Sequence, residues 1–324
     1  MKLFLSFFIL SISVLICHAF YSNNSWGFFA HRQINKLAIF TIPESQLFGF
    51  YKKHSIWIQE HAVDADKRRY AIKEEAPRHY IDIDHYGQWP YPNIPRDWDS
   101  AVAKYSEDSL FAYGIGPWHA QRMYWRLTGA FKSGDLDYIL RTSADLGHYL
   151  GDLHVPLHCT KNYNGQLTGQ KGIHGFWESR LPELYSKHYN FFTGKASYIS
   201  DVESAIWEIV LQSSAAVDSV LQFERKLEAD WQRSKYSYEP RGEQVIRVYA
   251  QEYSNAYHQQ LAGMVERRMT KSVIDLGSLW YSAWIDAGRP DLPGTLPDSV
   301  LSQDELEIEK KFKLGKILGR GHAH

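Results

Sequence analysis

Apolar residues recur every three or four positions along most of the chain, which is the spacing of an amphipathic helix. The alternation typical of strands is sparse, and no internal repeat is found. Helices are predicted over residues 28–40, about 118–131, 136–151, 202–231 and 242–269. Prolines and glycines fall between these stretches, where helices end. The pattern predicts an all-α protein folded as a single multi-helix domain.

The two ends of the chain differ from the middle. Residues 1–19 begin with a basic residue, continue with an apolar run and finish on Ala19, which is typical of a cleaved secretory signal. The run is too short for a membrane span, and no other stretch approaches that length. The chain becomes charged after Pro293. We therefore expect a signal peptide at 1–19, an all-α domain at 20–293 and a charged tail at 294–324.

Charge and cysteine content narrow the function classes. The 36 basic and 37 acidic residues give a formal net charge of −1, so no global basic field is available to hold duplex nucleic acid. Removal of the signal would take Cys17 and leave Cys159 alone, so no internal disulfide forms although the protein is expected to be secreted or periplasmic. Stability must then come from the core or from bound metal. We expect a monomer without a transmembrane segment after signal removal.

Candidate chemistry begins at the end of the predicted helix 136–151. His148 and Asp152 are four residues apart, so they project from one face of a helix. Pro156 stops the helix, and His158 lies just beyond it, where a turn could fold its side chain back.

A second pair, His174 and Glu178, repeats the spacing of four. A single histidine more often caps a helix or packs in a core than binds metal, and His154 keeps that ordinary interpretation because its spacing points it elsewhere. Two such pairs together with His158 make metal binding the better interpretation. Nitrogen and oxygen donors in this combination suit a borderline cation such as zinc.

Two upstream motifs complete the pattern. The first is WGFFAH, from Trp26 to His31, which opens the first predicted helix. The second is the segment DADKRRYAIKEEAPRHYIDID, in which Asp64 and His79 are fifteen residues apart. Taken alone, these motifs would indicate a helix start and a charged surface loop.

Together the motifs resemble the superfamily of bacterial zinc-dependent phospholipases C and the fungal and plant single-strand nucleases of the P-one and S-one type. The phospholipase signature runs His-Tyr-x-Gly/Thr-Asp, then x-x-x-Pro-x-His-x-x-x-Asn. This chain reads HYLGD from His148 to Asp152, followed by Pro156, His158 and Asn162. Every fixed position of the signature is met.

The resemblance, whose motifs cover roughly residues 26–178, implies an all-α fold around three zinc ions. Carried over by position, the first ion would be held by Asp64, His79, His148 and Asp152, the second by His158, His174 and Glu178, and the third by Trp26, His31 and the bridging Asp152. A metal-bound hydroxide would attack phosphorus, because zinc lowers the pKa of a coordinated water toward neutrality. The resemblance places Asp64, Asp82 and Lys67 in the catalytic machinery, the last two orienting ligands or contacting the phosphate.

The third zinc site depends on the mature N-terminus. In this superfamily the tryptophan is the first residue, and its amine and carbonyl both bind zinc. Cleavage after Ala19 would leave residues 20–25 ahead of Trp26. Either a second trimming step exposes Trp26, or the third site is weak or built differently. The disulfides of the fungal enzymes are absent, which indicates a bacterial relative.

Two phosphodiester substrates and one non-enzymatic role stay open. Glu178 and the complete signature favour a phospholipase C acting on phospholipid. The spacing from Trp26 to His31 and Trp177 beside the last ligand are closer to a single-strand nuclease acting on single-stranded nucleic acid, as endonuclease and 3′-nucleotidase. The third interpretation is an exported helical binding protein in which zinc is only structural. Aromatic residues that could form the rim of the substrate pocket are Tyr80, Tyr86, Trp89, Tyr91, Trp98 and Tyr163.

Overall fold

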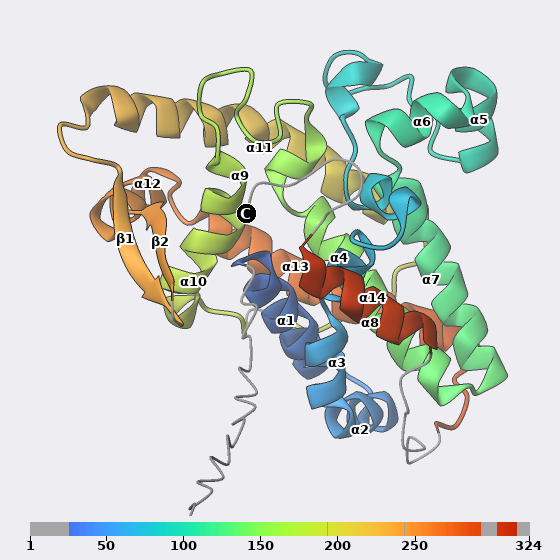
Figure 1. Ribbon diagram of the computed structural model, residues 1–324. Coiled ribbons are helices and arrows are strands. Elements are labelled where there is room, and N and C mark those ends of the chain that lie inside the picture. The colour runs from blue at the N-terminus through green and yellow to red at the C-terminus, as the bar shows by residue number, and fades with distance from the viewer. Residues whose placement is uncertain (1–25, 193, 243, 293–302, 316–324) are drawn as a thin grey trace, which may run out of the picture.

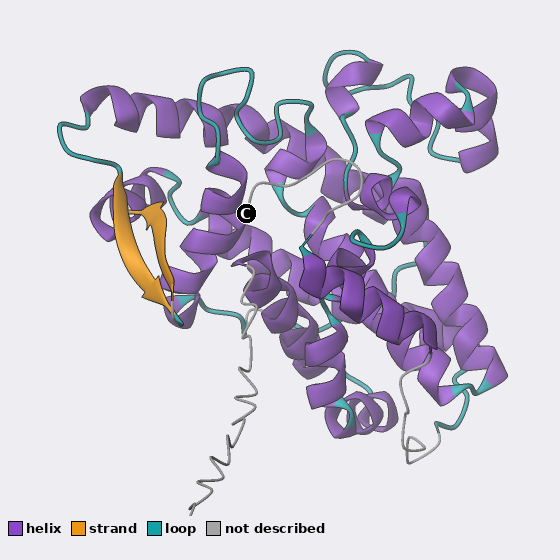
Figure 2. Ribbon diagram, in the orientation of Figure 1, coloured by secondary structure: helices purple, strands orange, loops and turns teal. Residues whose placement is uncertain are grey.

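The computed structural model describes residues 26–192, 194–242, 244–292 and 303–315 (Figure 1). The expected signal peptide at 1–19 lies outside the described residues, as do residues 294–302 and 316–324 of the expected tail. The described part is mostly helical and contains a two-stranded sheet, as Figure 2 shows. The predicted all-α class is therefore confirmed. None of the helices in the described ranges is both long and apolar enough to cross a membrane.

The elements follow one another along the chain, with longer connections at residues 87–97, 160–172 and 189–201. The α-helices are α1 (Trp26–Ala38), α2 (Ser45–Lys53), α3 (Ser55–His61), α4 (Asp64–Arg68), α5 (Trp98–Tyr105), α6 (Glu107–Tyr113), α7 (Gly116–Ser133), α8 (Leu136–Leu153), α9 (Ile173–Gly175), α10 (Leu181–Tyr185), α11 (Val202–Asp230), α12 (Gln251–Gln260), α13 (Met264–Asp286) and α14 (Gln303–Leu314). Short 3-10 helices cover Ile39–Thr41, Lys73–His79, Ile83–Tyr86, Pro156–Cys159 and Ser186–His188, and a π-helix covers Phe176–Arg180. The strands are β1 (Tyr236–Arg241) and β2 (Gln244–Tyr249).

Helix α8 forms where the apolar spacing predicted it. The side chain of Asp135 caps its first turn by accepting a hydrogen bond from the backbone nitrogen of Tyr138 at 3.0 Å. The helix ends before Pro156, as expected. Most of its residues are buried on every side, because α1, α3, α7 and α13 pack around it. Helix α8 is thus the central helix of the fold.

The predicted helix over residues 242–269 is wrong in its first part. Strand β2 occupies that stretch and pairs antiparallel with β1, with Tyr236 opposite Tyr249. Gly242 sits at the turn with a φ of +57°, a conformation that glycine adopts without strain. Gly263, with a φ of +77°, then separates α12 from α13. Figure 1 shows this hairpin beside α12 at one side of the molecule, away from α7 at the other.

Part of the expected charged tail is a helix. Helix α14 lies within it and packs against α4. Its Phe312 is buried, with its ring centroid 5.9 Å from that of Phe28 and 5.0 Å from that of Tyr70. Burial of this aromatic side chain stabilises the packing of an otherwise charged helix against the rest of the molecule.

Candidate metal centre

The C-terminal half of α8 delivers two buried polar side chains, His148 and Asp152, to one place. Nδ1 of His148 lies 2.9 Å from the carbonyl oxygen of Ala62. A carbonyl only accepts, so Nδ1 carries the proton and the Nε2 lone pair faces the interior of the site. This tautomer leaves Nε2 free to bind a metal.

Helix α1 approaches α8 closely enough to bring His31 into the same site. A Cβ at Gly151 would lie 3.1 Å from Nδ1 of His31, so the glycine makes room for the ring. The His31 ring stacks on that of His148 with centroids 4.0 Å apart. The sequence predicted His31 as a metal ligand, and the structure places its ring beside that of His148.

Asp152 stands at the centre of the site. We call the cluster the buried group of His31, Asp66, His79, His148, Asp152, His158, His174 and Glu178. Its Oδ1 lies 3.2 Å from Nε2 of His31 and 3.7 Å from Nε2 of His158. Its Oδ2 lies 2.9 Å from Nδ1 of His79 and 3.4 Å from Nε2 of His148. Burial alone would raise the pKa of this carboxyl, but the surrounding imidazoles, led by His158, hold the pKa well below its usual range. One anionic carboxylate thus faces four imidazoles through two oxygens.

The second group consists of His158, His174 and Glu178. Oε2 of Glu178 lies 3.1 Å from Nε2 of His158 and 3.0 Å from Nε2 of His174, and the two Nε2 atoms are 3.1 Å apart. The opposite ring nitrogens face backbone carbonyls: Nδ1 of His158 is 2.7 Å from the oxygen of His79, and Nδ1 of His174 is 3.1 Å from that of Tyr163. Both Nε2 lone pairs therefore point at each other and at the carboxylate.

Glu178 lies on the π-helix Phe176–Arg180 rather than on a regular α-helix. Single π-turns inside helices often occur at functional sites, because the extra residue changes the direction of a side chain. The spacing of four from His174 to Glu178 still brings both side chains to one point.

Lone pairs that converge in a buried place repel one another unless a proton or a cation lies between them. In three sets of candidate ligands, the first two of which share His148, one donor atom per residue lies within 4.8 Å of the others: His31, Asp66 and His148; His79, His148 and Asp152; and His158, His174 and Glu178. These are imidazole nitrogens and carboxylate oxygens, the donors that zinc prefers in sites without thiolates. The residues therefore fit a metal centre.

Asp66 takes the place that the sequence assigned to Asp64. Oδ1 of Asp66 lies 3.7 Å from Nε2 of His148 and 3.9 Å from Nδ1 of His79. Asp64 instead has its Oδ1 3.1 Å from Nζ of Lys67, on the outer side of α4. Residues two apart on a helix point in nearly opposite directions, so only one of the two aspartates can face the cluster. The spacing to His79 alone could not choose between them.

Two other predicted residues lie outside the ligand sets. Lys67 is 3.1 Å from Asp64 and 3.8 Å from Glu309 of α14, so it joins α4 to the C-terminal helix. Asp82 is buried and lines a neighbouring cleft. Trp26 begins α1, and its predicted contribution to the third site stays a prediction.

The buried groups of the cluster shift in different directions: burial lowers the pKa of His31 and of His79, but Asp152 outweighs burial and raises both. Burial, followed by the neighbouring His31, lowers the pKa of His148 to about 4, so His148 is neutral near neutral pH. Burial would raise the pKa of Asp66, but His148, His79 and Arg69 outweigh it and lower this pKa to about 2. Neutral imidazoles and ionised carboxylates are the forms that bind metal.

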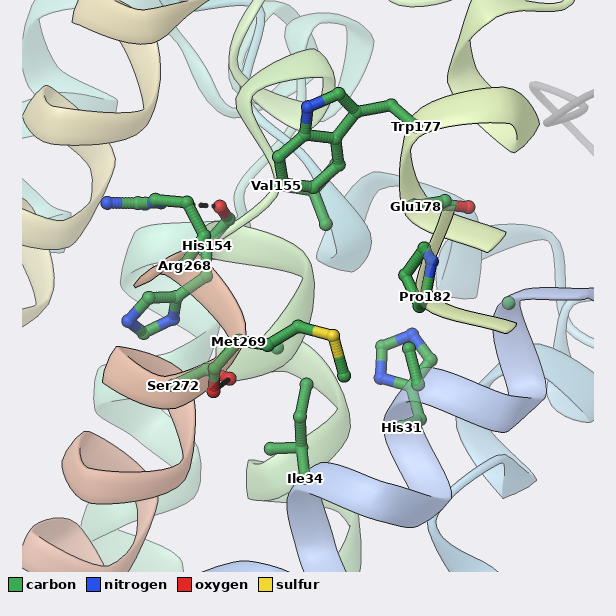
Figure 3. A pocket seen from close by; sticks show the side chains of 13 residues that line it. His31, Ile34, His154, Val155, Trp177, Glu178, Pro182, Arg268, Met269 and Ser272 are labelled. Atoms are coloured by element: carbon green, nitrogen blue, oxygen red, sulfur yellow. Dashed lines mark hydrogen bonds between the residues drawn. The ribbon is translucent and has the colours of Figure 1, made fainter. Parts of the chain in front are cut away.

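A small cavity adjoins the cluster between α1, α8, α13 and the π-helix, and Figure 3 shows it. His31 and Glu178 lie on one side of the cavity, while His154 and Arg268 lie on the other. Nε2 of His154 is 3.0 Å from Oδ2 of Asp275, so this histidine already has an anionic partner. His154 is thus outside the cluster, as predicted. The cavity holds about 30 Å³, room for one water.

A second, larger cleft has a volume of about 530 Å³. It is lined by Lys73, Ala76, Pro77, Tyr80, Asp82, Ala112, Lys161 and Tyr163. None of the candidate ligands lines this cleft, but two of its lining residues are joined to them: Tyr80 directly follows His79, and the carbonyl of Tyr163 faces His174.

Only two of the six aromatic residues expected at the rim, Tyr80 and Tyr163, line this cleft. Trp89 and Tyr91 line a separate cleft of about 330 Å³. Tyr86 and Trp98 pack against other aromatic rings, with centroids 4.9 Å from Tyr105 and 6.0 Å from Trp118 respectively.

Neither a known protein-family model nor a curated protein sequence matches the chain. The superfamily resemblance therefore rests on the motifs quoted above. The geometry of the cluster and of the cleft is what supports a function.

Proposed function

We propose that the protein is a zinc-dependent phosphoric ester hydrolase. The first candidate is an enzyme of the phospholipase C type. The observation that carries this proposal is Asp152, whose two oxygens face different imidazoles within one buried cluster. A carboxylate in that position can be shared between neighbouring cations. Closely spaced cations suit phosphoryl transfer, because together they neutralise the oxygens of the reacting phosphate.

Each residue of the cluster has a place in this proposal. The first ion would be held by Asp66, His79, His148 and Asp152, the second by His158, His174 and Glu178, and the third by His31 and Asp152 with Trp26 as the predicted addition. When bound, zinc supplies Lewis acidity and lowers the pKa of a coordinated water toward neutrality.

The protein scaffold contributes orientation. The backbone carbonyls of Ala62, His79 and Tyr163 fix the ring positions of three candidate ligands before any substrate arrives. A site held in this way loses little freedom when the substrate binds, which lowers the entropic cost of catalysis.

The cleft beside the cluster suits a phosphoester with an attached organic group. Lys73 and Lys161 supply positive charge for an anionic substrate. Glu178 lies within the cluster. A glutamate as the last ligand is the feature of the resemblance that favours the phospholipase branch. These features support lipid as the first of the substrates we propose.

A single-strand nuclease is the second candidate, and one observation favours it. Tyr80 and Tyr163 line the same cleft as the buried Asp82. Aromatic faces stack with nucleobases, and a carboxylate accepts hydrogen bonds from the amino edge of a base. The cleft therefore has the parts needed to hold a base beside the cluster.

Activity assays on zinc-loaded protein test the proposal. We expect hydrolysis of short-chain phosphatidylcholine or of single-stranded RNA or DNA, and a loss of at least about a hundredfold in Asp152→Asn, because the shared carboxylate is weakened as a ligand. Asp275→Asn is the matched control, since it neutralises another buried aspartate that pairs with a histidine. Folded, zinc-replete protein that cleaves neither substrate would contradict the proposal and favour structural zinc.

A further inference from the structure

His79 meets the cluster differently from the other histidines. His148, His158 and His174 turn Nε2 inward and face a backbone carbonyl with Nδ1. His79 turns Nδ1 inward, 2.9 Å from Asp152, so its Nε2 faces away from the cluster. Within the described residues, this buried Nε2 makes no hydrogen bond. Its charged neighbour is Oε1 of Glu75, at 3.6 Å.

Glu75 has no accessible surface at all. It lies four residues before His79 on the same 3-10 helix. Its Oε2 accepts a hydrogen bond from Arg78 at 2.6 Å and lies 3.5 Å from Nε of Arg68, and the hydroxyl of Tyr149 donates to its Oε1. A buried carboxylate is costly unless it is paired, and here three groups hold it in one orientation.

The residues around Glu75 connect it to the scaffold as well. Arg68 also contacts Oδ2 of Asp145 at 2.9 Å, so its guanidinium is held from two sides. Tyr149 is on α8, directly after the candidate ligand His148. The carboxylate of Glu75 is therefore fixed relative to the helix that carries the cluster.

We infer that Glu75 is a positioning residue of the metal centre, which acts through His79. A carboxylate beside Nε2 favours the tautomer that keeps the ring proton there, so the lone pair of Nδ1 is directed at the cation. It also increases the electron density of the ring and so strengthens His79 as a ligand. This inference rests on the proposed zinc centre, and no residue of the cluster itself is reassigned by it.

The test is the zinc affinity of Glu75→Gln, measured by competition with a chromophoric chelator and without substrate. Glutamine has nearly the same shape but no charge. We expect an affinity about tenfold to a hundredfold below that of the parent chain. The visible absorption spectrum of the cobalt-substituted protein should change as well, because that spectrum reports on the ligand field and not on overall stability.

Two control variants separate positioning from general stability. Glu74→Gln removes a neighbouring charge that is exposed, and Asp275→Asn neutralises the buried partner of His154, outside the cluster. We expect both to stay within about threefold of the parent zinc affinity, while Asp275→Asn loses thermal stability as Glu75→Gln does. Parental affinity and an unchanged cobalt spectrum in Glu75→Gln would overturn the inference, and so would an equal loss of affinity in Asp275→Asn.

Glu75→Asp keeps the test decisive if Glu75→Gln does not fold. It retains the charge that the arginines need but draws the carboxylate away from Nε2 by about one methylene. We expect a measurable, smaller loss of zinc affinity, and unchanged affinity would overturn the inference. A parent chain that binds no zinc would instead refute the proposed metal centre, so the two failures are distinguishable.

Discussion

Asp152 illustrates how one residue can organise the whole cluster. Each of its oxygens lies within 3.7 Å of two imidazole nitrogens. A buried anion with so many partners is stabilised only when every partner is in place. The signature HYLGD, which places this aspartate four residues after a histidine, was therefore the most informative stretch of the sequence.

The choice between Asp66 and Asp64 yields a prediction at the same scale. Asp66→Asn should reduce zinc affinity by about tenfold to a hundredfold, because it removes the charge of an oxygen that faces His148 and His79. Asp64→Asn should leave it near the parental value, because Asp64 pairs with Lys67 outside the cluster. Competition titrations of both variants check this. A larger loss in Asp64→Asn would restore the original prediction from spacing.

At the scale of elements, the approach of α1 to α8 decides whether His31 reaches the cluster. A Cβ added at Gly147 would collide with Oδ1 of Asn35, a buried side chain whose amide donates to the carbonyl of His31 at 3.0 Å. Asn35 therefore has little freedom to move aside. Position 147 therefore has no room for a side chain at this separation of the two helices.

Gly147→Ala should therefore lower the free energy of unfolding by about 1–3 kcal/mol, because overpacking outweighs the better helix propensity of alanine. Gly129→Ala in α7 is the matched control, since its new methyl group would meet nothing within 4 Å. It should raise the free energy of unfolding by up to about 1 kcal/mol. Urea denaturation of both variants measures the difference. Equal effects in the two variants would show that the α1–α8 contact does not constrain position 147.

Periodicity predicted the elements well where the helices are long and amphipathic, as in α8 and α11. It failed only at the start of the 242–269 stretch, because β2 is short and largely exposed, with Val248 and Tyr249 buried at its end, and carries no alternating pattern. It also could not identify Asp66 or Glu75. Both lie on short helical turns whose orientation depends on tertiary contacts, and sequence spacing does not encode that orientation.

The whole molecule assembles the candidate centre from segments that are far apart in the chain. Donors come from α1, α4, the 3-10 helix Lys73–His79, α8, and the stretch from Pro156 to Arg180. The packing of α1, α7, α8 and α13 forms one hydrophobic core, and Leu157, Ile173 and Phe176, beside the second group of ligands, belong to another. Rigid support of this kind keeps ligand geometry precise.

Helix α14 adds a contact that the motifs did not anticipate. Phe312 packs against Phe28 of α1, while Glu309 lies 3.8 Å from Lys67 of α4. The C-terminal helix thus touches two elements that carry candidate ligands. In Figure 1 α14 lies beside α4, the helix that carries Asp66.

The zinc content of the folded chain tests the central claim most directly. Purified protein would be dialysed against metal-free buffer after zinc loading, and its zinc per chain measured by elemental analysis. The clustering of the three ligand sets predicts more than one zinc ion per chain, with fewer retained in Asp152→Asn than in Asp275→Asn. A folded parent chain that retains no zinc would contradict the account.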